Sequence, residues 1–151
     1  MTPEEIDLVQ STFEKVRPIS TAAAGMFYGR LFEIAPQVRP LFPEDLAEQK
    51  RKLMGMLATA VTNLHQVEKI VPAMQDLGRC HAGYGVTDAH YAPVGEALIW
   101  TLDQGLGEAF RPETRKAWLR VYQLVSQTML LGSAALDMGT PVESPEWGEE
   151  V

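Results

Sequence analysis

The sequence has little cysteine, because Cys80 is the only one among 151 residues. A single cysteine cannot form a disulfide within the chain, and scarce cysteine is typical of proteins kept in a reducing compartment. No apolar run is long enough to cross a bilayer. The first ten residues, MTPEEIDLVQ, lack the basic segment and apolar run of a secretory signal. We therefore expect a cytoplasmic protein without membrane insertion.

Positive charge is also scarce. The chain carries 13 Lys and Arg against 20 Asp and Glu, for a formal net charge of −7. Nucleic-acid binding needs a basic face for the phosphates, so no nucleic-acid partner is predicted. Internal repeats and strand-like alternation are absent from the sequence as well. A length of 151 residues is about one domain.

Apolar residues recur at helical spacing along most of the chain, which predicts an all-α domain of six to seven helices. The stripes that predict these helices lie within residues 6–16, 23–32, 53–64, 70–81, 94–106 and 118–129. A Thr2-Pro3-Glu4-Glu5 start predicts the first helix, and Ser20 or Thr21 is the expected cap of the second. Three prolines within residues 36–46 predict a corner with at most one helical turn. The expected domain covers residues 1–135, followed by an acidic tail over 136–151 whose proline and glycine content predicts disorder.

One polar residue on an apolar stripe has two interpretations. His81 continues the stripe of Ile70, Met74 and Leu77, so its ring should point inward. It is either a core histidine hydrogen-bonded to a backbone carbonyl or a metal ligand. Zinc needs several protein ligands at once, and no Cys/His pair has zinc-site spacing. A porphyrin supplies four nitrogens of its own, so a metal site with one histidine favours haem.

The neighbouring Cys80 raises the question of a covalent haem. That attachment needs a second cysteine three residues earlier, in the pattern C-x-x-C-H, but position 77 is leucine. Any haem is therefore held without a thioether bond. Cys80 lies one residue off the inward stripe, and we expect it at the helix surface.

Four segments occur in an order and at spacings that carry a family resemblance. They are FYGRLFEIAPQVRPLF, AEQKRKLMGML, QDLGRCHAGYGV and HYAPVGEAL. The chain resembles a bacterial single-domain globin and is similar to the haem domain of flavohaemoglobins over about residues 3–132. The resemblance implies a globin fold around a non-covalent haem b.

The resemblance also implies roles at the iron. His81 would be the proximal iron ligand. On the opposite, distal side, Tyr28, Gln49 and Leu53 would line the place where dioxygen, nitric oxide or carbon monoxide binds. By themselves, Tyr28 and Gln49 would be interpreted as a core-edge tyrosine and a solvated glutamine. In the family such a pair donates hydrogen bonds to bound dioxygen, and whether either side chain also coordinates ferric iron stays open.

The remaining implied contacts surround the porphyrin. Matching the family places cofactor-binding residues at Phe42, Lys52, Leu53, Leu57, Leu77, Val86, Tyr91 and Val94. Among them, Phe42 would wedge against the ring and Lys52 would reach a haem propionate. Leu77 and Val86 would pack on the proximal side.

The sequence departs from flavohaemoglobins in two respects. Tyr91 matches the tyrosine that they place behind the proximal histidine, but the accompanying glutamate falls near Ser133. A carboxylate there would push electron density onto the iron, so its replacement argues against peroxidase-like chemistry. The chain is also too short for their flavin and nicotinamide domains, so any turnover would need a separate reductase.

These features lead to competing hypotheses of function. The first is a globin that binds dioxygen reversibly, for storage, transport or scavenging. The second is an enzyme, a nitric oxide dioxygenase working with an external reductase. A gas sensor is less favoured because no output domain accompanies the helices, and a haem-free helical interaction protein is the alternative outside haem chemistry. The sequence predicts no oligomeric state.

Overall fold

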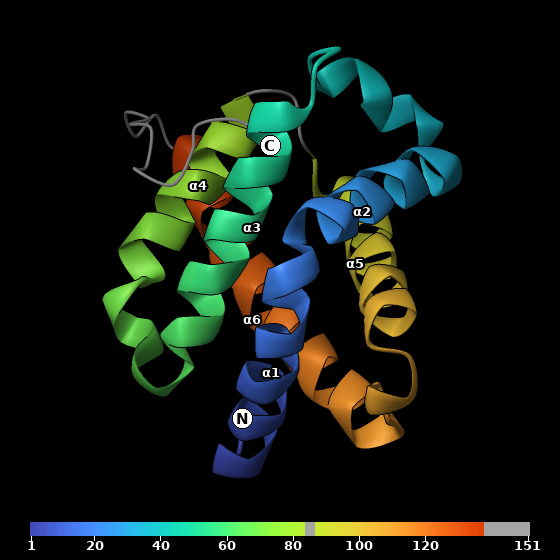
Figure 1. Ribbon diagram of the computed structural model, residues 1–151. Coiled ribbons are helices and arrows are strands. Elements are labelled where there is room, and N and C mark those ends of the chain that lie inside the picture. Colours follow the sequence, from blue (N-terminus) through green and yellow to red (C-terminus); the bar gives the residue numbers. More distant parts are fainter. Residues whose placement is uncertain (84–86, 138–151) are drawn as a thin grey trace.

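The computed structural model describes residues 1–83 and 87–137, and within these the regular structure is helical throughout (Figure 1). The α-helices are α1 (Pro3–Val16), α2 (Ser20–Ile34), α3 (Ala47–Thr62), α4 (Val71–Gly83), α5 (Tyr91–Leu106) and α6 (Pro112–Asp137). Short 3₁₀ segments connect them: η1 (Arg17–Ile19), η2 (Pro36–Leu41), η3 (Leu64–Lys69), η4 (Asp88–His90) and η5 (Gly107–Ala109). The all-α prediction is confirmed. None of the described helices is long and apolar enough to cross a membrane.

The start of α1 is the predicted one. The Thr2 hydroxyl accepts a hydrogen bond from the Glu5 amide at 3.1 Å, and the Glu5 carboxylate accepts one from the Thr2 amide at 3.0 Å. This reciprocal pair satisfies two amides that a helix start leaves without partners. The predicted cap of α2 by Ser20 or Thr21 is wrong, because α2 follows η1 directly and begins at Ser20 itself. The Ser20 amide already bonds to the Arg17 carbonyl, so a capping side chain has no role there.

The corner after α2 contains more helix than predicted. η2 covers six residues, which is two turns at three residues per turn. Pro36 occupies its first turn, where the missing amide hydrogen and the fixed φ of proline suit a helix start. Proline therefore begins this helix instead of preventing it.

A single arginine holds the rest of the corner. The Arg39 guanidinium donates to the carbonyls of Phe42 at 3.2 Å, Pro43 at 3.0 Å and Glu44 at 3.2 Å. Its Cζ also lies 5.0 Å from the centre of the Phe32 ring, a favourable position for a cation. These contacts hold the backbone that carries Phe42.

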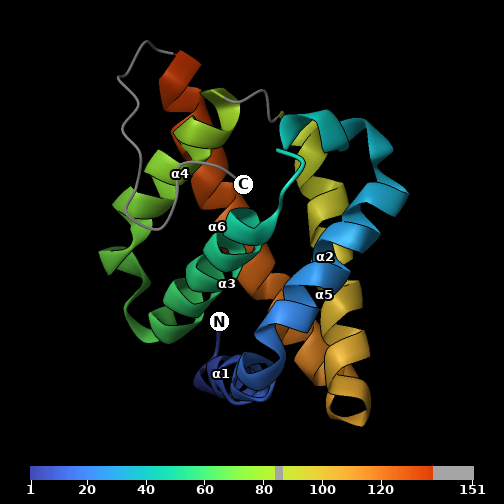
Figure 2. The ribbon, with the colours of Figure 1, turned by 45° about the horizontal axis from the view of Figure 1, so that its top comes forward.

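Two pairs of helices form the frame of the molecule: α2 lies along α5, and α4 lies along α6 (Figures 1 and 2). The second pair is in backbone contact through glycine. A Cβ added to Gly78 of α4 would lie 2.7 Å from the Met129 Cα and closer still to its carbonyl. A Cβ added to Gly132 of α6 would lie 2.8 Å from the Gln75 Cα. Only residues without side chains allow this crossing.

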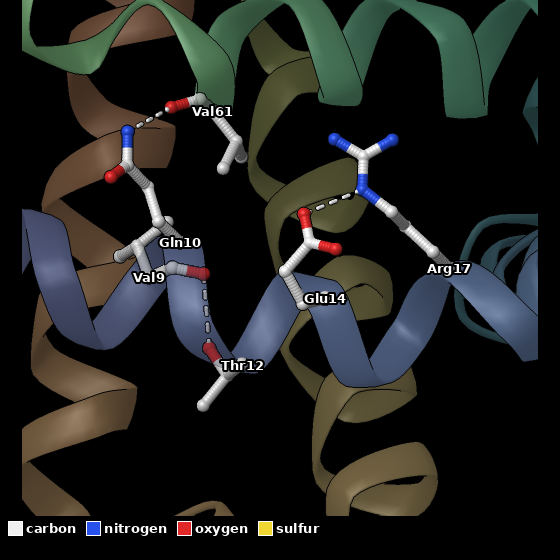
Figure 3. A network of polar contacts seen from close by, with 6 residues as sticks. All are labelled: Val9, Gln10, Thr12, Glu14, Arg17 and Val61. Carbon is white, nitrogen blue, oxygen red and sulfur yellow. Dashed lines mark hydrogen bonds and ion pairs between the residues drawn. The ribbon is translucent and has the colours of Figure 1, made fainter.

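Polar contacts connect α1 to the rest of the core. The Trp118 indole of α6 is fully buried and donates to the Thr12 hydroxyl at 3.0 Å. The Gln10 amide donates to the Val61 carbonyl of α3 at 2.9 Å (Figure 3). α1 and α6 thus pack against each other, and α1 contacts α3 through Gln10, which points away from Thr12 (Figure 3).

Cys80 is buried, with 3% of its surface exposed, so its predicted place at the helix surface is wrong. The apolar stripe of α4 marks one buried face, on which His81 lies. The contact of Gly78 with α6 extends the burial on one side of this face, and Cys80 extends it on the other, because residues two positions apart point about 200° apart around a helix. The buried arc of α4 is therefore wider than the stripe.

The helical domain extends slightly further than expected. α6 ends at Asp137, two residues past the predicted boundary at 135. The predicted disordered tail lies almost wholly in residues 138–151, outside the described residues, and stays a prediction.

Candidate functional site

A cavity opens between the two helix pairs. Its empty space, with the open mouth included, is about 940 Å³. Its described wall is almost entirely hydrocarbon and includes residues from α2, α3, α4, α5 and α6. Six of the predicted site residues line it: Phe42, Leu53, Leu57, His81, Tyr91 and Val94. The cavity suits an apolar group.

His81 is the buried nitrogen base of this cavity, with 8% of its surface exposed. Its Nδ1 lies 2.7 Å from the Leu77 carbonyl oxygen, one helical turn earlier. A carbonyl oxygen only accepts hydrogen bonds, so Nδ1 carries the proton and donates. Burial lowers the pKa of His81, although the bond to Leu77 opposes this shift, and the lower pKa favours the neutral ring. A neutral ring that donates from Nδ1 keeps a lone pair on Nε2.

That arrangement fits a metal ligand. Histidines that bind metals usually donate their other ring N–H to a carbonyl or carboxylate, which fixes the ring and raises its basicity. The described residues contain no group of three or more His, Cys, Asp or Glu side chains that would hold a bare metal ion. A metal bound by His81 must therefore bring most of its ligands with it. Haem does so, and the apolar wall of the cavity matches the character of its ring.

Aromatic rings form the wall on the α2 side. The Phe42 ring centre lies 5.6 Å from the rings of Tyr28 and Phe32, in edge-to-face contact with each. Tyr28 also contacts Phe27 edge to face at 5.0 Å. Since Phe27 and Phe42 line the cavity, Tyr28 lies one ring behind its surface.

Tyr28 and Gln49 form a buried polar pair behind this wall, each with 1% of its surface exposed. The Tyr28 hydroxyl donates to the Gln49 backbone carbonyl at 3.3 Å, which joins α2 to the first turn of α3. Burial raises the pKa of Tyr28, so the phenol keeps its proton. The structure thus places a protonated phenol, bonded to the backbone of a buried glutamine, behind the aromatic wall of the cavity.

Three predicted contacts are arranged differently from the others. The Leu77 side chain is buried outside the cavity wall, and Leu77 serves the site through its carbonyl. Lys52 is half-buried and is also not part of the described wall. Val86 lies outside the described residues, so its proximal role stays a prediction.

The wall contains residues that the sequence did not mark as site residues, above all Tyr122 and His90. The Tyr122 hydroxyl donates to the Tyr91 carbonyl, and its ring crosses α5 where a Cβ on Gly95 would lie 2.7 Å from Cε2. The apolar stripe of the last helix already contained Tyr122, but periodicity shows only that a residue faces inward. Ser133 lies in α6, and its side chain is outside the part of the structure that is described.

Comparisons with known proteins agree on one family. Over 149 residues the chain is 29% identical to neuroglobin of Dissostichus mawsoni, covering 89% of this chain and 93% of that protein. It is 25% identical over 128 residues to flavohemoprotein of Bacillus subtilis, covering 83% of this chain but only 32% of that longer protein.

A solved structure shares the fold. It is an engineered carbene transferase described as a putative nitric oxide dioxygenase from Rhodothermus marinus. The TM-score is 0.83 at 23% identity, covering 92% of this chain and 97% of that one. The sequence pattern of the globin family matches residues 25–129, about two thirds of the chain. The chain belongs to the globin family and is a haem-binding globin similar to the haem domain of flavohaemoglobins.

Proposed function

We propose that this globin binds dioxygen reversibly at a haem b held by His81, with Tyr28 and Gln49 as hydrogen-bonding groups on the distal side. One observation carries the proposal: the buried Tyr28 phenol contacts the Phe42 ring of the cavity wall and bonds to the backbone of the buried Gln49. Haem, when bound, supplies the iron at which a diatomic gas binds. The other chemistry comes from side chains of this chain.

Each side chain of the proposed haem site has a distinct role. The neutral His81 ring offers the Nε2 lone pair, while the Leu77 carbonyl holds its orientation. Leu53, Leu57 and Val94 contribute apolar surface that excludes water. In a dry site a hydrogen bond to a partly negative acceptor is stronger than in water, so the Tyr28 hydroxyl favours a polar gas ligand over an apolar one.

We also propose that the haem is held without a covalent bond to the chain. Cys80 is the only cysteine and is not part of the described cavity wall, and Leu77 takes the place where a second cysteine would be needed. The proposal also includes a cytoplasmic location, which the single cysteine favours.

Replacing Tyr28 with phenylalanine tests the distal assignment. The dissociation rate constant of dioxygen is expected to rise at least about tenfold, equivalent to about 1.4 kcal/mol, the size of one hydrogen bond to a charged acceptor. Carbon monoxide is less polar, so its dissociation should change less. Stopped-flow displacement of each gas measures both constants.

The matched control for this variant is Phe32→Leu. Its ring lies 6.1 Å from that of Tyr28, so the change disturbs the same aromatic cluster without removing a hydroxyl. The control should leave the ratio of dioxygen to carbon monoxide dissociation unchanged. An unaltered dioxygen constant in Tyr28→Phe would mean that this hydroxyl does not reach the ligand.

A second candidate function is nitric oxide dioxygenation, favoured by the same polar pair and by the relative that is named for it. This reaction joins nitric oxide and dioxygen to nitrate and consumes one electron, which a separate reductase would supply. Nitrate formed per protein, measured with a reductase and nicotinamide cofactor present, separates the two functions. Many equivalents of nitrate per protein would support the enzyme. Nitric oxide consumption that stops after one cycle would instead support the dioxygen carrier.

A further inference from the structure

The cavity has a second imidazole, which none of the roles above uses. His90 lines the same cavity as His81. It ends η4, immediately before α5 begins, and is half-buried, whereas His81 is buried. His90 therefore lies toward the solvent edge of the cavity.

The hydrogen bonding of His90 assigns its proton. The Thr87 backbone amide donates to Nδ1 of His90 at 3.0 Å. A nitrogen that accepts a hydrogen bond carries no proton, so the proton of the neutral ring is on Nε2. His81 shows the reverse pattern, with Nδ1 as the donor. The two rings therefore suit different partners. Nε2 of His81 has a lone pair that can bind a metal, whereas Nε2–H of His90 can donate to a hydrogen-bond acceptor.

The residues around His90 are compatible with a negatively charged hydrogen-bond acceptor. Asp, Glu, Lys and Arg are all absent from the described cavity wall. Two other polar groups of the wall are occupied, since the Tyr122 hydroxyl donates to the Tyr91 carbonyl and the Ser126 hydroxyl to the Gln123 carbonyl. The 16-residue helix α5 starts next to His90, and the N-terminal end of a helix favours negative charge.

We propose that His90 binds a carboxylate of the haem at the edge of the cavity, with Nε2–H as the donor. The inference rests on the proposed haem site at His81. Haem is apolar except for its two propionates, and charged groups stay near solvent because burying them is costly. A half-buried donor at the edge of an apolar cavity meets both requirements. His90 would then act in retaining and orienting the cofactor, a role that the family resemblance implies for Lys52.

Haem transfer to an excess of an apo-globin acceptor tests this role. The dissociation rate is measured for the wild type and His90→Ala, each loaded with haem or with haem dimethyl ester, in which both carboxylates are blocked. For haem, His90→Ala is expected to accelerate loss about tenfold, as for a lost bond to a charged acceptor. For the ester, the two proteins should differ by less than about twofold, because no carboxylate remains to be bound.

The control is His65→Ala, since His65 is exposed on η3 and does not line the cavity. It should leave both rates unchanged. Equal acceleration with both cofactors would give His90 a purely structural role and overturn the inference, and so would no acceleration with either. Either of these two results would leave the proposed haem site at His81 unaffected. A wild type that takes up neither cofactor would instead overturn the proposed function together with the inference.

Discussion

Replacing His81 with alanine is expected to make haem dissociate at least about a hundredfold faster. Removing groups that merely support a metal-binding histidine typically costs about 10–100-fold in affinity, so loss of the ligand itself should exceed that range. The Soret band of the purified variant should be weak or shifted. Absorbance spectra in the ferric, ferrous and carbon-monoxide-bound states measure the change in ligation, and haem transfer to an acceptor measures the rate.

The alternative for His81 is a core histidine that only satisfies the Leu77 carbonyl. Losing such a bond would lower the free energy of unfolding by about 1–3 kcal/mol without changing the haem spectra. Added imidazole separates the two roles, because it should enter the space left by the ring and restore the wild-type spectrum. His65→Ala again serves as the control. A His81→Ala protein that keeps haem with unchanged spectra would contradict the ligand assignment.

A second large effect is expected at the crossing of α4 and α6. Gly78→Ala should lower the free energy of unfolding by about 3 kcal/mol, the upper end for overpacking a core. The added methyl group would overlap the backbone of Met129, which cannot rotate away as a side chain would. For a domain of this size the midpoint of thermal unfolding should fall by about 10 °C. Denaturant titration of the apo-protein measures the loss.

The matched substitution is Gly55→Ala. Gly55 is exposed in the middle of α3, and an added Cβ there would meet nothing within 4 Å. Alanine favours helix over glycine by up to about 1 kcal/mol, so this variant should be slightly more stable than the wild type. His81 follows Gly78 by three residues, so Gly78→Ala should also weaken haem retention, whereas Gly55→Ala should not. Equal stability of the two variants would show that the helices separate at little cost.

The features predicted correctly from the sequence are local ones. The capping pair of Thr2 and Glu5 involves residues three positions apart, and the stripe that leads to His81 is a repeat within one helix. Both are visible in any short window of the sequence. The wrong predictions concern how one segment packs against another. Cys80 is buried although it lies one residue off the stripe of α4, because tertiary packing covers a wider arc of this helix than the stripe marks.

The candidate site divides in the same way. Periodicity places His81 inward but does not distinguish a core histidine from a ligand. Periodicity likewise provides no reason to bury Gln49 beside Tyr28, which only the family resemblance suggested. No sequence pattern marked His90 as a residue of the cavity. The segment η4 is too short to show periodicity, and the cavity wall is assembled from segments far apart in the chain. Which residues share a cavity depends on tertiary packing.

The wall of the cavity draws on residues from Phe27 to Met129, and the Trp118 indole bonds to Thr12, 106 positions earlier. This long separation determines when the site can exist during synthesis. A nascent chain that has released only α1 to α3 presents the apolar wall of Phe27, Phe42 and Leu53 to water, with nothing yet to cover it. Such surfaces are prone to aggregate until their partners emerge. The complete cavity therefore forms only after translation has delivered most of α6.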